Sequence, residues 1–184
     1  MTVRRTCLLH VVAILFAVFL ACSVPVAATD YSLPESTVLP DQKLLYRISR
    51  NLDRVSSWYT WGDVAAVKRH LRLADKYLVE AKLLFKKRNF LYAIDALERS
   101  NLEFERIPRS IEHAILSGKD IISLRTDVQD AAKAHVAVLG VLSEQVPEVL
   151  VLTPADEESE QFEIREQLFI SAGIRKSASS LISD

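Results

Sequence analysis

Apolar residues recur at helical spacing along most of this chain, with polar residues on the opposite faces. A period of about 3.6 residues predicts amphipathic helices that each bury one stripe. The pattern predicts five helices, over residues 41–57, 63–88, 89–118, 120–145 and 157–181. Pro108 lies within the third, where its missing backbone N–H predicts either a kink or an end. We therefore expect an all-α fold, an antiparallel bundle of four to five helices.

The apolar stripes also predict the side chains of the core. The predicted core comprises Leu52, Leu71, Ala74, Leu78, Ala81, Ile94, Leu97, Val128, Val138 and Leu142. His135 lies in the same stripe as Val128, and we interpret it as a buried histidine with a backbone partner. The last helix has a looser apolar face, predicted to comprise Phe162, Ile164, Leu168, Phe169 and Ile174.

Polar residues and glycine mark the expected helix ends. Asp63 and Asn89 are predicted N-caps, because their side-chain oxygens can accept the unpaired N–H groups of a first turn. Gly118 is a predicted C-cap. The apolar run 149–152 fits either an extended connector or a short helix, because periodicity alone does not separate the two.

Residues 1–28 have the organisation of a secretory leader. Arginines at positions 4 and 5 precede an apolar stretch, and small residues before Ala28 predict cleavage after it. Two alternatives stay open. The sequence Phe19-Leu20-Ala21-Cys22 resembles a lipobox, in which Cys22 would be acylated, and the apolar stretch is also long enough for an uncleaved anchor. The chain is expected to be exported, to the cell envelope or the extracellular space, either free or membrane-anchored.

A polar linker with two prolines is predicted over residues 29–40, ahead of a bundle domain over 41–183. Charge is uneven within that domain. Residues 41–109 hold 15 basic and 9 acidic side chains, whereas residues 110–184 hold 6 and 13. Two oppositely charged halves that face each other would explain this, and so would a basic surface for an acidic envelope polymer or membrane head groups. No RNA-binding motif accompanies the basic residues, and we expect no nucleic-acid partner.

Residue types that carry chemistry are sparse. Both cysteines, Cys7 and Cys22, lie in the leader, so a chain cleaved after Ala28 has no thiol for catalysis or for metal. His70, His113 and His135 fall on three different predicted helices and lack metal-ligand spacing. The sequence contains no Gly-x-Ser-x-Gly motif and no glycine-rich phosphate loop. We therefore predict no enzyme activity, no metal site and no cofactor.

Trp58, Tyr59 and Trp61 form the most unusual local feature. They could form a stacking surface for a glycan or peptide. The favoured interpretation is a hydrophobic plug at one end of the bundle, because each aromatic side chain can bury about 150–250 Å².

Residues 39–105 resemble a bacterial family of exported helical proteins of unknown function, DUF5667. Four segments carry the resemblance: Leu39-Pro40-Asp41, Trp61-Gly62-Asp63, Leu71-Arg72-Leu73-Ala74 and Leu78-Val79-Glu80-Ala81. The chain departs from the family pattern by one extra residue before Tyr46 and by Lys76-Tyr77 in place of two basic residues. The resemblance implies export and a helical fold, but no activity.

The sequence thus predicts a non-enzymatic binding or structural component of the bacterial cell envelope. Its expected partner is a protein or an envelope polymer, with membrane contact only through the N-terminal segment or a lipid on Cys22. The alternative is a periplasmic-type helical bundle that binds a small molecule or a metal and carries out redox chemistry.

Overall fold

The computed structural model describes residues 31–34, 37, 51, 53, 62–152 and 160–183. Within them the chain is mostly helical, which confirms the predicted helical bundle. The elements are α3 (Asp63–Lys86), α4 (Phe90–Glu105), α5 (Ile107–Leu116), α6 (Ile122–Gln145), β1 (Val149–Leu152), β2 (Glu160–Glu163) and α7 (Ile164–Leu181).

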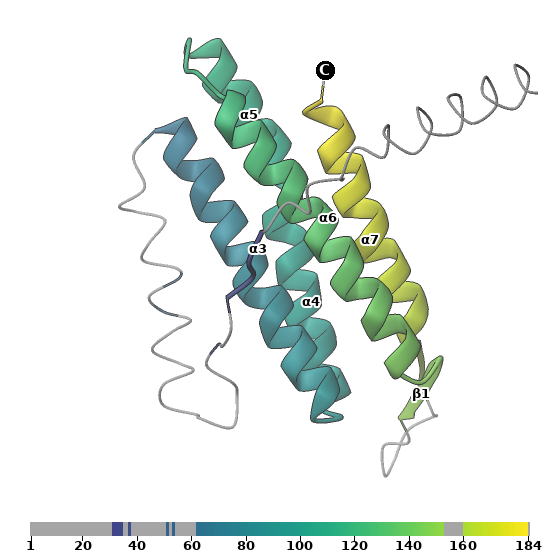
Figure 1. Ribbon diagram of the computed structural model, residues 1–184. Helices are drawn as coiled ribbons and strands as arrows, with labels where there is room; N and C mark the ends of the chain where they lie inside the picture. The colour runs from purple at the N-terminus through teal and green to yellow at the C-terminus, as the bar shows by residue number, and fades with distance from the viewer. Residues whose placement is uncertain are drawn as a thin grey trace, which may run out of the picture. The chain divides into compact units, whose positions relative to one another are not determined.

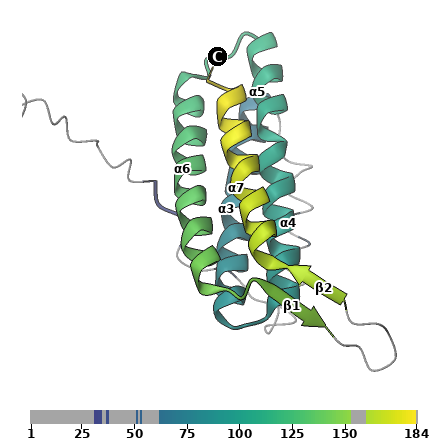
Figure 2. The ribbon, with the colours of Figure 1, turned by 90° about the vertical axis from the view of Figure 1, so that its right-hand side faces the viewer.

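Two antiparallel hairpins lie side by side, α3 with α4 and α6 with α7 (Figures 1 and 2). Between the hairpins, α3 adjoins α6 and α4 adjoins α7, and these neighbours run in the same direction. Val67 near the start of α3 shares a core cluster with Leu124 and Val128 near the start of α6. The predicted antiparallel order therefore holds within each hairpin, while the packing between hairpins is parallel.

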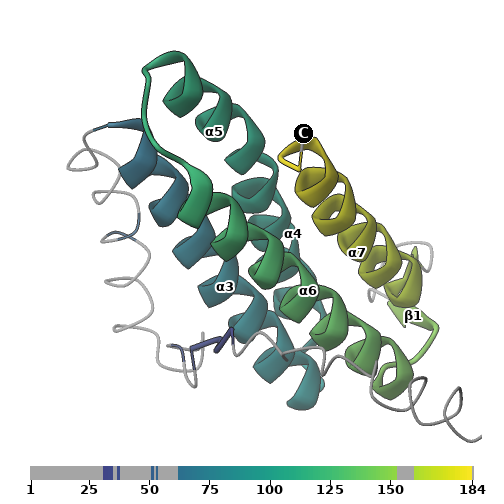
Figure 3. The same cartoon turned by 45° about the horizontal axis from the view of Figure 1, so that its top comes forward.

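Pro108 begins a new helix instead of bending a continuous one. Helix α4 ends at Glu105, and Pro108 lies in the first turn of α5, where a backbone N–H has no helical partner in any case. Ile107, Ile111 and Ala114 then continue the buried stripe. Helix α5 follows α4 toward the same end of the bundle (Figure 3).

The helix ends differ partly from the prediction. Gly62, not Asp63, is the N-cap of α3, and the Asp63 carboxylate instead accepts a hydrogen bond from Ser117 Oγ at 3.0 Å. Asn89 is the N-cap of α4, but its side chain makes no capping hydrogen bond. Gly118 follows α5 with φ of 67°, as a predicted C-terminal glycine should.

The core prediction is correct for most of its members. Leu71, Ala74, Leu78, Ala81, Leu97, Val128 and Leu142 are buried, whereas Ile94 and Val138 are half-buried and pack against the core. The predicted face of α7 is partly wrong. Ile164 and Leu168 are buried, but Phe169 is 79% exposed and Ile174 is half-buried. The buried face continues instead through Ser171, Arg175 and Ala178.

The apolar run 149–152 is a strand, so the extended alternative is correct. It pairs antiparallel with β2, with Val149 opposite Glu163 and Leu152 opposite Glu160. Because residues 160–163 are used in this ladder, the last helix begins at Ile164 and not at residue 157. Leu150 packs against the core, and this contact explains why the run is apolar.

Part of the stretch predicted as a linker packs against the bundle. Tyr31 and Leu33 are partly buried against the two core clusters. Asn51 and Asp53 are helical, but the other residues of the predicted first helix, including Leu52, lie outside the described part of the chain. So do the leader with Cys22 and the aromatic group Trp58, Tyr59 and Trp61. None of the described helices is both long enough and apolar enough to cross a bilayer.

Candidate functional site

Polar side chains meet in the middle of the bundle, between the two apolar core clusters. Helices α3, α4, α6 and α7 each contribute at least one: Asp75 from α3, Ser100 and Asn101 from α4, His135 from α6, and Ser171 and Arg175 from α7. His135 and Arg175 are each 0% exposed. We call this group the buried polar network.

His135 lies at its centre. Its Nε2 is 2.7 Å from Asp75 Oδ1, and Arg175 Nε lies 3.5 Å from its Nδ1. A guanidinium can only donate, so Nδ1 accepts and the ring proton lies on Nε2, where it is donated to the carboxylate. Burial lowers the pKa of His135, as does Arg175, and Asp75 only partly offsets this. The imidazole is therefore neutral and links a carboxylate to a guanidinium. The prediction of a buried histidine is correct, but its partner is Asp75, not the backbone.

Arg175 uses its remaining donors within the same network. Nη2 donates to Ser100 Oγ at 2.6 Å, and Nη1 donates to Asn101 Oδ1 and, at 3.3 Å, to the Ser171 carbonyl. Its guanidinium also lies 5.2 Å from the centre of the Phe104 ring. Burial lowers the pKa of Arg175 to about 10, so the side chain keeps its charge at neutral pH.

Tyr31 connects the network to the segment before the bundle. Its hydroxyl donates to Asp75 Oδ2 at 2.6 Å. Burial and the Asp75 carboxylate together raise the pKa of Tyr31 well above its usual value, so the phenol keeps its proton. Both carboxylate oxygens of Asp75 are thus hydrogen-bonded, one to Tyr31 and one to His135.

The Asp75–His135 pair resembles the carboxylate that orients a general base, but the rest of the arrangement differs. In a catalytic triad the second ring nitrogen faces a hydroxyl that it deprotonates. Here that nitrogen faces Arg175, which has no proton to give up at working pH. The pair is also closed off from solvent. Its geometry serves to hold a buried charge pair together.

The other two candidate histidines lie apart from this network. His70 Nδ1 is 2.6 Å from Glu103 Oε2, whose other oxygen accepts from Arg106 at 2.7 Å, while His113 is exposed on α5. Burial raises the pKa of Glu103, but the hydrogen bond from His70 and the charge of Arg106 outweigh it, so the net shift is downward. Across the described ranges, no three His, Cys, Asp or Glu side chains gather as a metal site would require.

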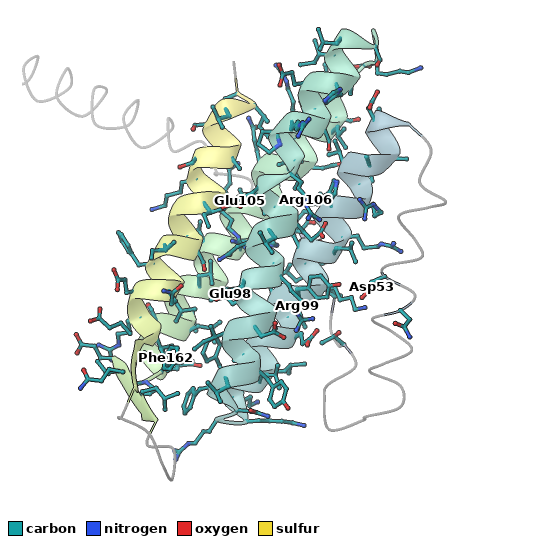
Figure 4. The ribbon with its side chains drawn as sticks, turned by 180° about the vertical axis from the view of Figure 1, so that it is seen from behind. Asp53, Glu98, Arg99, Glu105, Arg106 and Phe162 are labelled. Carbon is teal, nitrogen blue, oxygen red and sulfur yellow. The ribbon has the colours of Figure 1, made fainter. Side chains whose placement is uncertain are left out.

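Some of the charged side chains on α3 and α4 pair with each other. Arg99 contacts Glu80 at 3.2 Å and Asp95 at 2.9 Å, and its guanidinium lies 4.8 Å from the Tyr77 ring (Figure 4). The basic side chains of α3 at Lys68, Arg72, Lys82 and Lys86 are exposed. Contact between the basic half of the domain, residues 41–109, and its acidic half therefore does not account for these exposed basic side chains.

A groove runs along the outer side of the bundle between α6 and α7. One part has a volume of about 910 Å³ and a second part, continuous with it through Val136 and Lys176, about 600 Å³. We call this the α6–α7 groove. Its lining is mostly apolar or small and includes Val136, Leu139, Gly140, Phe169, Ala172 and Gly173.

Asp75, Ser100 and Arg175 are not among the residues predicted from the sequence. A signal for Arg175 was present, because Ile164, Leu168, Ser171, Arg175, Ala178 and Ile182 follow one another at alternating spacings of four and three residues. Fold and site define a mostly helical bundle with a charged, hydrogen-bonded centre. No family model, curated protein or solved structure matches the chain.

Proposed function

We propose that this chain is a non-enzymatic, exported protein that works by binding another protein through its outward helix faces. The observation that carries the proposal is how the buried polar network uses its members. Asp75, His135 and Arg175 direct their polar atoms at one another and at neighbouring side chains. A catalytic or ligand-binding centre in a bundle would instead present such groups to a cavity.

The outer surface supports a protein partner over a polysaccharide or other polar polymer. Large apolar side chains are exposed on several helices, among them Leu116 at 78%, Phe169 at 79% and Leu181 at 71%. Among these, Phe169 borders the α6–α7 groove, and exposed apolar side chains at a groove are typical of surfaces that other proteins cover.

Export is part of the proposal and rests on the leader pattern of residues 1–28. The intact mass of the protein from its own cells tests it. A chain that starts at Thr29 fits secretion, and a diacylated chain that starts at Cys22 fits a lipoprotein. A full-length chain recovered from the cytoplasm would contradict export.

Site-specific photo-crosslinking in cells tests the binding function. A photoreactive phenylalanine analogue would replace Phe169, Leu116 or Ile122, all exposed, in separate experiments, with the buried position Phe104 as the matched control. We expect one discrete adduct that depends on the position of the probe and is absent at Phe104. A stoichiometric metal or a Soret band in the purified protein would contradict the proposed non-enzymatic binding function and favour the metal-binding or redox alternative.

A further inference from the structure

We propose that the α6–α7 groove is the contact surface of a symmetric homodimer, in which Phe169 of each copy packs into the groove of the other. This proposal rests on the proposed function, because it assigns the partner of one helix face. The occupant is a second copy of this chain, and the charges of the groove itself carry that choice.

The two ends of the larger part of the α6–α7 groove have opposite charge. Lys176 lies at one end, where the smaller part begins with Lys133 beside it, while Glu144 and Glu166 line the other end. The smaller part continues beyond the lysines to Ser183. Arg165 also lies at the acidic end, but it turns back and donates to the Val146 carbonyl at 3.4 Å. Lys133 contacts Asp130 on its own helix at 3.0 Å and is otherwise exposed.

This polarity makes the groove complementary to itself. At a rise of about 1.5 Å per residue, Lys133 and Glu144 lie about 16 Å apart along α6. We place a two-fold axis perpendicular to the groove, midway between Lys133 and Glu144. This axis makes the groove of the second copy run in the opposite direction to that of the first. The Lys133–Lys176 end of one copy then faces the Glu144–Glu166 end of the other. Such an isologous contact forms each ion pair twice and closes without leaving a free surface for further copies.

The apolar part of the groove fits the same axis. The axis passes level with Ser171 on α7, midway between Glu166 and Lys176, so Phe169 of one copy comes level with Gly173 of the other, each two residues from the axis. Gly173 has open space where a side chain would stand, and the same is true of Gly140 across the groove. A phenyl ring that is 79% exposed in the single chain thus comes level with a position where no side chain obstructs it. Large aromatic side chains near the centre of an interface are typical anchors of protein interfaces.

At the acidic end, neighbouring carboxylates of the same copy repel one another. The Glu166 side chain, by hydrogen bond and by charge, raises the pKa of Glu163 beside it. A lysine from the second copy would relieve this repulsion.

Sedimentation velocity of the full chain, with charge-reversal variants, tests the proposal. Lys176→Glu and Glu166→Lys each place like charges across the axis, and we expect each to weaken the dimer about three- to tenfold. Within one copy the same changes bring opposite charges together, so a loss of folding does not explain weaker association. Reversal of all four charges, with Lys133→Glu and Lys176→Glu at one end and Glu144→Lys and Glu166→Lys at the other, restores opposite charges across the axis and should recover the dimer. Lys68→Glu, an exposed change on α3, is the matched control and should leave the dimer intact.

Phe169→Ser should weaken the dimer about 100-fold, while Leu116→Ser, equally exposed but outside the groove, should not. A chain that stays monomeric at high micromolar concentration overturns the proposal, and so does a dimer that ignores both Phe169→Ser and the charge reversals. The photo-crosslinks separate the two proposals. A monomer whose Phe169 probe captures a different protein refutes the dimer and keeps the binding function, whereas a monomer without adducts at any exposed position refutes both.

Discussion

Asp75 and Arg175 lie on opposite sides of one imidazole ring in the middle of the bundle. The carboxylate is 2.7 Å from Nε2 of His135, and the guanidinium Nε is 3.5 Å from Nδ1 of the same ring. Because the ring is neutral, the two charges balance each other through it. A buried charge is tolerated only when it is paired and hydrogen-bonded, so each of the two residues depends on the other.

Removal of Arg175 should therefore be costly. We expect Arg175→Met to lower the free energy of unfolding by about 3–5 kcal/mol, because the Asp75 carboxylate then remains buried without its counter-charge. Urea unfolding followed by circular dichroism measures the change. Lys82→Met, an exposed change on α3, is the control and should stay within about 0.5 kcal/mol.

The double variant Asp75→Asn/Arg175→Met removes both charges and should be less destabilised than the sum of the single variants. Additive losses would show that the two side chains do not act as a charge pair. They would contradict the inference that Asp75 and Arg175 stabilise each other across His135.

The pH dependence of stability follows from the same ring. The pKa of His135 in the folded chain lies below the 6.5 of a free histidine. Between these two pKa values the unfolded chain binds a proton at this residue and the folded chain does not. The contribution of neutral His135 to the free energy of unfolding is complete above about pH 6.5. It is lost as the pH falls below this value, by at most about 1.4 kcal/mol per pH unit. His135→Gln should remove this slope, because an amide can still donate to Asp75 but does not titrate. His113→Gln is the matched control, and an unchanged slope in His135→Gln would refute the assignment.

The helices were predictable because their signal is local. Each apolar stripe on α3 and α6 can be read from residues three and four apart, and nearly all of the predicted core residues on them are buried. The α7 stripe was misassigned because Phe169 is apolar and Arg175 is charged, whereas position in the heptad places the arginine inside and the phenylalanine outside. At these two residues, hydrophobicity and heptad position predict opposite burial. The side chains that hydrogen-bond the buried Arg175 lie mainly on other helices, α4 and α6.

The strand pair and the polar network depend on distant residues. Val149 pairs with Glu163, and nothing in the polar β2 segment indicates a strand by itself. Asp75 lies four residues after Leu71 and three before Leu78, so its position falls in the buried stripe although its side chain is charged. Its partners Tyr31 and His135 come from 44 and 60 residues away. Such contacts exist only once the hairpins have packed, so periodicity within one helix does not reveal them.

Arg88 and Gly118 offer a matched test of helix termination. Each lies one residue beyond a helix C-cap with positive φ, 58° for Arg88 and 67° for Gly118. A side chain at such φ costs about 1 kcal/mol relative to glycine. We expect Arg88→Gly to stabilise the chain by roughly 0.5–1 kcal/mol and Gly118→Ala to destabilise it by a similar amount. Thermal unfolding measures both, and shifts of the same sign would contradict the assigned backbone conformation.

Tyr31 decides whether the segment before the bundle is part of the folded unit. Its hydroxyl bonds a carboxylate that also holds His135, so Tyr31→Phe leaves Asp75 with one partner fewer. A hydrogen bond to a charged group contributes about 1.5–3 kcal/mol when buried, and partial exposure of Tyr31 reduces the expected loss to about 1 kcal/mol. Tyr92→Phe, at an exposed position on α4, should change stability by less than about 0.5 kcal/mol. Equal stabilities of wild type and Tyr31→Phe would mean that this segment does not contribute to the fold, whereas the expected loss would place the start of the folded unit at or before Tyr31.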